Sequence, residues 1–265
     1  MKKWWLFFVL VAIVGIVVFW PRKKEIKTVE TRNVKLETRI KNNKIINKIA
    51  IMADIHNDVE SLQKVYDMVQ NDGIKMIVLA GDLTINGTMG EQNKMKEVTD
   101  KWKIPVYKVP GNHDDYKKVW IFGEKYQSVK VDGIKLLLID NSNWQGLGTD
   151  QKIWIEQESA ECKIIKCVAI MHMPLFNTMS KHVMGEYSLE TANEAMWLKN
   201  ILVTNGIVTG YSGHLHYASS YTNDGWETVL VGAISRDRNT QTPRYTEVTL
   251  YDDGRVENGV KIITN

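Results

Sequence analysis

The sequence predicts an α/β fold of two facing mixed β-sheets flanked by helices, preceded by one N-terminal transmembrane helix. Three observations predict it. In the first half of the body, short apolar runs alternate with segments of helical periodicity, which is the rhythm of parallel strands with covering helices. Turn signals and short apolar runs dominate the last third, which favours antiparallel strands. A continuous apolar run lies near the N-terminus of the 265-residue chain.

The apolar run covers residues 4–20, with only the small Gly15 as an interruption. As a helix it would span about 25 Å, at the short end for crossing a bilayer. Tryptophans at both ends and basic residues outside them are typical of such a helix. A cleavable signal peptide is the alternative, but it needs small residues after the apolar run, and residues 19–22 have none. We therefore predict an uncleaved single-pass membrane anchor over residues 1–21, with the body outside the cytoplasm.

Residues 22–43 are charged and lack an apolar stripe, so we predict a tether followed by one domain over residues 44–265. The net charge of +3 hides an asymmetry, because residues 1–43 are strongly basic and the body is mildly acidic. A mildly acidic body disfavours nucleic acid as a partner, because a nucleic-acid backbone is bound by clustered Lys and Arg.

The first predicted strand covers residues 49–53, a short apolar run. A helix follows, which Asn57 or Asp58 can cap and which Asp72-Gly73 ends. Its buried face, at helical spacing, consists of Leu62, Val65, Tyr66 and Val69. Two more buried strands are predicted over residues 76–80 and 106–109, with a polar helix near residues 90–101 between them.

The second half begins with a hairpin signal, Asp132-Gly133, between strands over residues 128–131 and 134–140. The later elements are a helix near residues 150–161, a strand over 164–171, a helix near 189–203 and a strand over 207–210. Turns at residues 223–225 and 252–254 divide the strand-rich C-terminal part.

The chain has two cysteines, Cys162 and Cys167, at the entry to a predicted strand. We expect two free thiols, because a disulfide would need an oxidising compartment and a bend between the two residues. Their spacing does not match a zinc-binding CxxC motif.

Polar motifs rich in His, Asp and Asn follow the predicted strands. They are Asp54-Ile55-His56, Gly81-Asp82, Gly111-Asn112-His113-Asp114, Met171-His172 and Gly213-His214-Leu215-His216. Ligands gather at the carboxyl ends of strands in such sheets. Mixed nitrogen and oxygen ligands suit Zn, Mn or Fe, and a shared carboxylate can hold two ions about 3.5–4 Å apart. The glycines of these motifs are expected to allow sharp turns and close approach of a substrate.

These motifs, in this order, resemble the calcineurin-like metallophosphoesterase superfamily, whose pattern is D-x-H, GD, GNH followed by Asp or Glu, H and GHxH. The resemblance covers roughly residues 48–240. It implies a phosphoric ester hydrolase acting on phosphodiesters or phosphomonoesters. It also implies two divalent metal ions (Mn, Fe, Zn or Ni) and a hydroxide, activated between them, as the nucleophile.

The resemblance also implies a role for each motif residue. One ion is carried by Asp54, His56, Asp82 and His216, and the other by Asp82, Asn112, His172 and His214. Asp82 is then a bridging carboxylate, and the neutral amide of Asn112 limits the negative charge. His113 binds no metal and would protonate the leaving group. Asp114 would either orient His113 or cap the segment that follows.

The sequence departs from the protein serine/threonine phosphatases, because residues 83–86 lack the Asp-Arg pair of that branch and Asp114 stands in place of Glu. It is closer to the small bacterial phosphoesterases and the cyclic-nucleotide phosphodiesterase-like group. Two alternatives stay open. The predicted anchor suggests a membrane-tethered pyrophosphatase acting on a lipid-linked or lipid-headgroup substrate. A non-catalytic scaffold of the same fold is disfavoured, because no ligand residue is missing.

Four other residues could approach the site. His182 is expected in an exposed loop. Arg236, Arg238 and Arg244 follow the strand predicted near Val231 and could meet a phosphate, but a solvated loop is the favoured interpretation.

Overall fold

The computed structural model describes residues 44–263 of the chain. One mixed sheet has the strand order β11-β10-β1-β2-β3. Its strands are β1 (Ile45–Met52), β2 (Met76–Ala80), β3 (Val106–Val109), β10 (Arg244–Tyr251) and β11 (Val256–Ile262). The first three are parallel, whereas β10 and β11 are antiparallel to their neighbours.

The other mixed sheet has the order β4-β5-β6-β7-β9-β8. Its strands are β4 (Gln127–Val131), β5 (Ile134–Ile139), β6 (Lys166–Met171), β7 (Thr209–Ser212), β8 (Ala218–Asn223) and β9 (Trp226–Val231). The central strands β5, β6, β7 and β9 are parallel, and antiparallel β4 and β8 close the two edges. The two mixed sheets predicted from the sequence are therefore confirmed.

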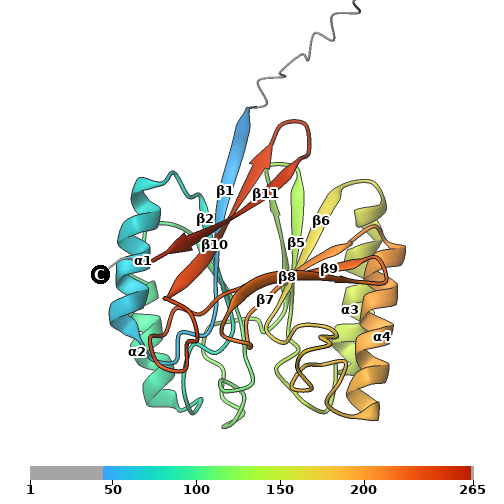
Figure 1. Ribbon diagram of the computed structural model, residues 1–265, viewed down its shortest axis with the longest axis horizontal. Coiled ribbons are helices and arrows are strands. Elements are labelled where there is room, and N and C mark those ends of the chain that lie inside the picture. Colours follow the sequence, from blue (N-terminus) through green and yellow to red (C-terminus); the bar gives the residue numbers. More distant parts are fainter. Residues whose placement is uncertain (1–43, 264–265) are drawn as a thin grey trace, which may run out of the picture. The chain divides into compact units, whose positions relative to one another are not determined.

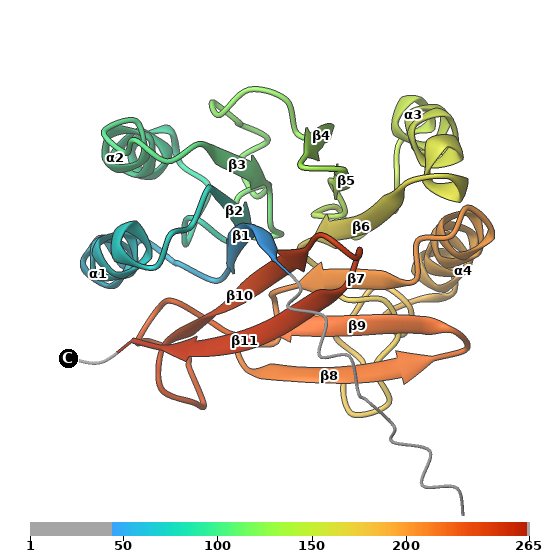
Figure 2. The ribbon, with the colours of Figure 1, turned by 90° about the horizontal axis from the view of Figure 1, so that it is seen from above.

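Helices cover the outer face of each sheet, and the inner faces pack together (Figures 1 and 2). The helices are α1 (Val59–Asn71), α2 (Met89–Thr99), α3 (Thr149–Ser159) and α4 (Leu189–Thr204). Successive side chains of strand β1 point to opposite faces of the sheet, as this layered packing requires. Ile49 and Ile51 join the core between the sheets, whereas Ala50 and Met52 pack on the side of α1 and α2.

Local signals in the sequence explain where the first two helices begin. Asp58, one of the two predicted candidates, caps α1 by accepting a hydrogen bond from the Ser61 amide at 3.0 Å. Thr88 and Glu91 form a reciprocal capping box at the start of α2. The predicted inner face of α1 is buried in full, which confirms the helical periodicity.

The fold brings the polar motifs to one edge of the molecule. The motifs follow β1, β2, β3, β6 and β7 directly. These strands run parallel within their sheets, so their carboxyl ends lie together, at the lower side of Figure 1. Strand β9 is parallel to β7, so the loop that follows β9 begins at the same edge of the molecule.

The predicted anchor (residues 1–21) and tether (residues 22–43) lie outside the described residues. Within residues 44–263, no helix is both long enough and apolar enough to cross a bilayer.

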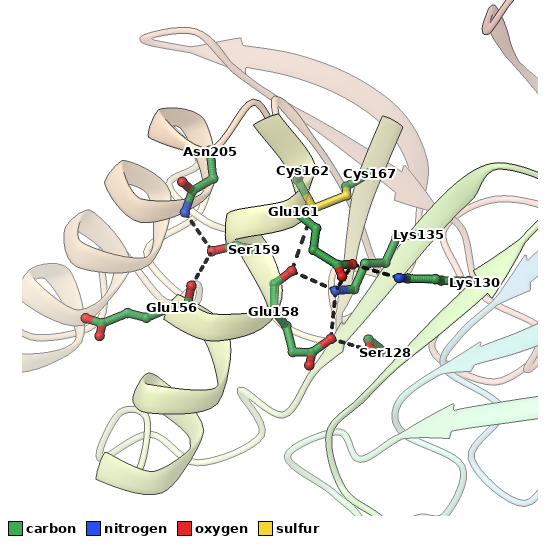
Figure 3. Close-up of a disulfide and its surroundings, with 10 residues drawn as sticks. All are labelled: Ser128, Lys130, Lys135, Glu156, Glu158, Ser159, Glu161, Cys162, Cys167 and Asn205. Atoms are coloured by element: carbon green, nitrogen blue, oxygen red, sulfur yellow. Dashed lines mark hydrogen bonds and ion pairs between the residues drawn. A yellow bond between two sulfur atoms is a disulfide. The ribbon is translucent and has the colours of Figure 1, made fainter. Parts of the chain in front are cut away.

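The expectation of two free thiols is wrong, because Cys162 and Cys167 form a disulfide (Figure 3). The 3₁₀ helix η1 (Ala160–Lys163) turns the chain before β6 and brings the two Cα atoms to 5.5 Å. That separation lies within the usual range for a disulfide. The nearly buried ammonium of Lys135 lies close by, between Glu158 and Glu161, at 2.7 and 3.0 Å.

Candidate metal centre

The predicted ligands meet in two groups that share one carboxylate. Within each group, every residue offers a nitrogen or carboxylate oxygen, and these atoms lie within 4.8 Å of one another. The first group is Asp54, His56, Asp82 and His216, and the second is Asp82, His172 and His214. Asp82 belongs to both, which is the arrangement expected of a bridging carboxylate.

Nitrogens of neighbouring imidazoles face one another inside the groups. The Nε2 atoms of His56 and His216 are 3.2 Å apart, and Nε2 of His172 is 3.3 Å from Nδ1 of His214. The Asp82 carboxylate lies 3.2 Å from Nε2 of His172 and 3.7 Å from Nε2 of His56. All of these atoms converge on the interior of the site.

The outward nitrogens of three imidazoles contact backbone carbonyls, which can only accept hydrogen bonds. His172 Nδ1 donates to Ala80 at 2.9 Å, His214 Nε2 to His182 at 2.8 Å and His216 Nδ1 to Arg238 at 3.2 Å. When each ring is neutral, these hydrogen bonds leave the lone pair on its inward nitrogen, the form that binds a metal. Lone pairs and carboxylates that face one another fit a bound cation.

Asn112 offers a further oxygen ligand. Its Oδ1 atom is buried and accepts no hydrogen bond from residues 44–263. The next residue, His113, donates its backbone amide to Oδ1 of Asp82 at 2.9 Å, so this turn is fastened to the shared carboxylate. A buried carbonyl oxygen without a donor is costly, and a cation would supply its missing partner.

Burial and neighbouring charges set the protonation of these groups. Burial lowers the pKa of His56 and of His214 to about 3, so both rings are neutral at pH 7. Burial opposes ionisation of Asp82, but the nearby His172 holds the pKa of Asp82 below its usual value. Burial also raises the pKa of Asp54. Burial opposes protonation of His172, but the Asp82 carboxylate raises the pKa of His172 to about 9. A cation bound at Nε2 of His172 would take the place of this proton, because metal binding releases protons from its ligands.

The ligands sit on strained backbone. Five of them have a left-handed φ, which is uncommon for residues other than glycine: Asp54 (54°), His56 (47°), Asp82 (52°), His214 (73°) and His216 (57°). The motifs hold one another in place, since the amide of His56 donates to the Asp82 carbonyl at 3.0 Å, and that of His214 to the Asp54 carboxylate at 2.9 Å. Such strain is typical of functional sites.

Glycines let the ligands approach closely. A Cβ atom on Gly111 would lie 2.2 Å from both the backbone nitrogen and Oδ1 of Asp82, and one on Gly81 would lie 2.5 Å from Nδ1 of His172. From the sequence, these glycines were expected to let a substrate approach closely. In the structure, the ligand side chains of Asp82 and His172 occupy that space instead.

A family model for calcineurin-like phosphoesterases matches residues 47–218. The chain belongs to this family.

Two curated relatives are phosphodiesterases by name. The probable glycerophosphodiester phosphodiesterase GpdQ of Arcobacter nitrofigilis is 24% identical over 171 residues, covering 59% of this chain and 60% of that protein. The chain thus spans less than two thirds of that relative's length. The probable cyclic nucleotide phosphodiesterase CBUA0032 of Coxiella burnetii is 26% identical over 198 residues, covering 66% of this chain and 78% of that protein.

Two solved structures share the fold. Purple acid phosphatase PPD1 from yellow lupin is 13% identical with a TM-score of 0.61, covering 82% of this chain and 51% of that one. GAP50, described as the anchor in the inner membrane complex of Plasmodium, is 15% identical with a TM-score of 0.55, covering 84% and 90%. At these identities the likeness concerns the fold alone.

His113 and Asp114 are neighbours in the chain, but their side chains make different contacts. Nδ1 of His113 donates to the Ile85 carbonyl at 2.7 Å. The buried carboxylate of Asp114 accepts hydrogen bonds from the amides of Leu83 (3.1 Å), Thr84 (2.9 Å) and Gly111 (2.9 Å). Asp114 thereby joins the Gly111–Asp114 turn to the segment after Asp82, and Ile85 fixes the imidazole ring of His113.

Residues outside the motifs also contact the ligands of the metal centre. His182 is exposed, as expected, yet its carbonyl binds His214 and its ring stacks on that of His214, with centroids 5.0 Å apart. Trp144 packs against His182 at 4.7 Å. A cavity of about 260 Å³ opens beside Asn112 and is bordered by Tyr116 and Trp144. No sequence motif predicts these contacts, because they depend on the tertiary course of the loops.

The Gly111→Ala variant should bind metal about 10- to 100-fold more weakly, because the new methyl group displaces Asp82, which both groups share. Metal affinity is measured by competition with a chromophoric chelator. Gly90→Ala in α2 is the control, since its Cβ would meet open space. Equal metal affinity of the Gly111→Ala and parent proteins, with both folded by circular dichroism, would contradict this assignment.

Proposed function

We propose that this phosphoesterase hydrolyses phosphodiesters with two divalent cations held by its paired ligand groups. The observation that carries the proposal is the shared carboxylate of Asp82, around which the ligand atoms of each group lie within 4.8 Å. A carboxylate shared in this way could serve two divalent cations. One cation would be held by Asp54, His56, Asp82 and His216, and the other by Asp82, Asn112, His172 and His214.

When bound, the cations supply positive charge that polarises the phosphoryl group and its attacking water. The protein's own groups prepare this centre. Asp82 belongs to both ligand groups, and its negative charge would reduce the repulsion between two bound cations. The carbonyls of Ala80, His182 and Arg238 fix the imidazole tautomers, so that the ligand nitrogens need no rearrangement.

His113 is the proposed acid for the leaving oxygen. Its Nδ1 is occupied by the Ile85 carbonyl, so Nε2 is the atom that transfers the proton. A positioned acid of this kind contributes about 10²- to 10⁴-fold to the rate. Asp114 is a positioning residue, because it fastens the turn that carries His113 to the amides of Leu83 and Thr84.

Two observations support diesters as the substrate class. The curated relatives GpdQ and CBUA0032 are phosphodiesterases by name. The cavity of about 260 Å³ beside Asn112 offers room for an organic group next to the phosphoryl position. Tyr116 and Trp144 offer ring faces for contact with a planar group, and the other residues of the border are polar or charged.

We also propose that residues 1–21 anchor the protein in a membrane and that the catalytic domain lies outside the cytoplasm. The disulfide between Cys162 and Cys167 supports this location, because disulfides persist in oxidising compartments and are rare in the cytosol.

The full chain in detergent, loaded separately with Mn, Zn, Fe or Ni, should hydrolyse bis-p-nitrophenyl phosphate faster than p-nitrophenyl phosphate. The release of nitrophenolate measures both rates, and chelation should abolish them. A faster rate for the monoester would overturn the choice of diesters. Absence of turnover with every metal would overturn the proposed hydrolysis.

His113→Ala should retain its metal but lose about 10²- to 10⁴-fold in turnover, since it removes the proposed acid and no ligand. The loss should be smallest for esters with an acidic leaving group, which need little protonation. Asp82→Ala is the contrasting variant and should lose metal, as measured by elemental analysis. A His113→Ala protein without metal, beside a fully loaded Asp82→Ala protein, would reverse the two assignments.

Expressed in bacteria, the full chain with alkaline phosphatase fused to its C-terminus should show phosphatase activity, because that reporter is active only outside the cytoplasm. The same fusion without residues 1–43 is the control and should be inactive. In the full-length protein, Cys162 and Cys167 should resist alkylation until reduced. An inactive full-length fusion whose cysteines react without reduction would contradict the proposed location.

A further inference from the structure

Arg238 contacts two functional groups of the site. Its Nη1 atom lies 3.3 Å from Nε2 of His113, the nitrogen proposed to protonate the leaving oxygen. Its backbone carbonyl accepts the hydrogen bond from Nδ1 of the ligand His216 at 3.2 Å. Arg238 is exposed in a loop, as the sequence favoured, yet its guanidinium group lies beside His113 at the edge of the metal centre.

The loop that carries Arg238 is fastened to the centre. It follows β9, and the amides of Ile234 and Ser235 donate to the carbonyls of Ala53 and Asp54, each at 3.0 Å. The side-chain amide of Asn239 donates back to the carbonyls of Ala233 and Ser235 at 3.1 and 3.2 Å. These bonds hold Arg238 at a left-handed φ of 63°, an uncommon conformation that the surrounding loop imposes.

The charge of Arg238 is not balanced by a carboxylate in the part of the chain that the structure describes. Two residues earlier, Arg236 forms ion pairs with Asp58 at 3.3 Å and Glu60 at 2.9 Å. Arg238 forms no ion pair with any carboxylate of residues 44–263, and its partner is a neutral acceptor. Since Nδ1 of His113 donates to Ile85, Nε2 of the neutral ring accepts from the guanidinium. When Nε2 carries the proton for the leaving oxygen, it cannot accept from Arg238, and the guanidinium is free to bind another acceptor.

We propose that Arg238 binds a non-bridging oxygen of the phosphoryl group that is cleaved. This rests on the proposed function, in which His113 serves the leaving oxygen. A phosphoryl group within hydrogen-bond distance of Nε2 of His113 lies within reach of a guanidinium group 3.3 Å from the same atom. The exchange of a neutral imidazole acceptor for an anionic oxygen is favourable, because charge-assisted hydrogen bonds are the stronger ones. Arginine suits this task through its planar donors.

The test measures inorganic phosphate binding to the metal-loaded full chain by calorimetry. Arg238→Asn is the informative variant, because Asn tolerates a left-handed φ and leaves the carbonyl that binds His216 in place. Phosphate should bind about 10- to 100-fold more weakly, as expected for loss of a charged hydrogen bond. Arg238→Lys should recover part of the affinity. KM for the diester should rise in parallel, with metal content unchanged.

Arg236→Gln is the matched control, since it removes a charge from the same loop that is already paired with Asp58 and Glu60. It should bind phosphate within about twofold of the parent. Phosphate affinity of Arg238→Asn equal to that of the parent would overturn the proposal, as would loss of metal from this variant. A parent protein that binds phosphate but cleaves no ester would instead overturn the proposed function alone.

Discussion

The buried carboxylate of Asp82 is the interaction around which the site is arranged. A charge removed from water is costly unless it is paired and hydrogen-bonded. Asp82 is 1% exposed, and it is met by the rings of His172 and His56 and by the backbone amide of His113. Gly111 has no side chain because one would occupy the same space as this carboxylate. The left-handed backbone of the ligands is the conformational cost of bringing these groups together.

Both sheets are needed to complete the centre. The loops after β1, β2 and β3 supply Asp54, His56, Asp82 and Asn112, and the loops after β6 and β7 supply His172, His214 and His216. The two halves meet where the carboxylate of Asp54 accepts the amide of His214. Apolar residues from both sheets form one core between them, so the packing of the sheets fixes the separation of the ligands.

Groups that hydrogen-bond to the ligands set the tautomers and positions of the ligand side chains. Backbone carbonyls of Ala80, His182 and Arg238 set which nitrogen of each imidazole carries the proton. Asp114 sets the position of the turn that bears His113. Burial keeps His56 and His214 neutral, and neutral imidazoles are the form that binds a divalent cation.

The sequence by itself determined the two mixed sheets, the buried face of α1 and the ligand motifs, because each depends on periodicity or on residues adjacent in the chain. The prediction of free thiols at Cys162 and Cys167 was wrong, because the turn made by η1 has no strong local signal in the sequence. The tertiary structure alone decided which residues surround the ligands. Arg238 and His182 reach them through loops whose course is set by long-range backbone hydrogen bonds, and no spacing in the sequence encodes those contacts.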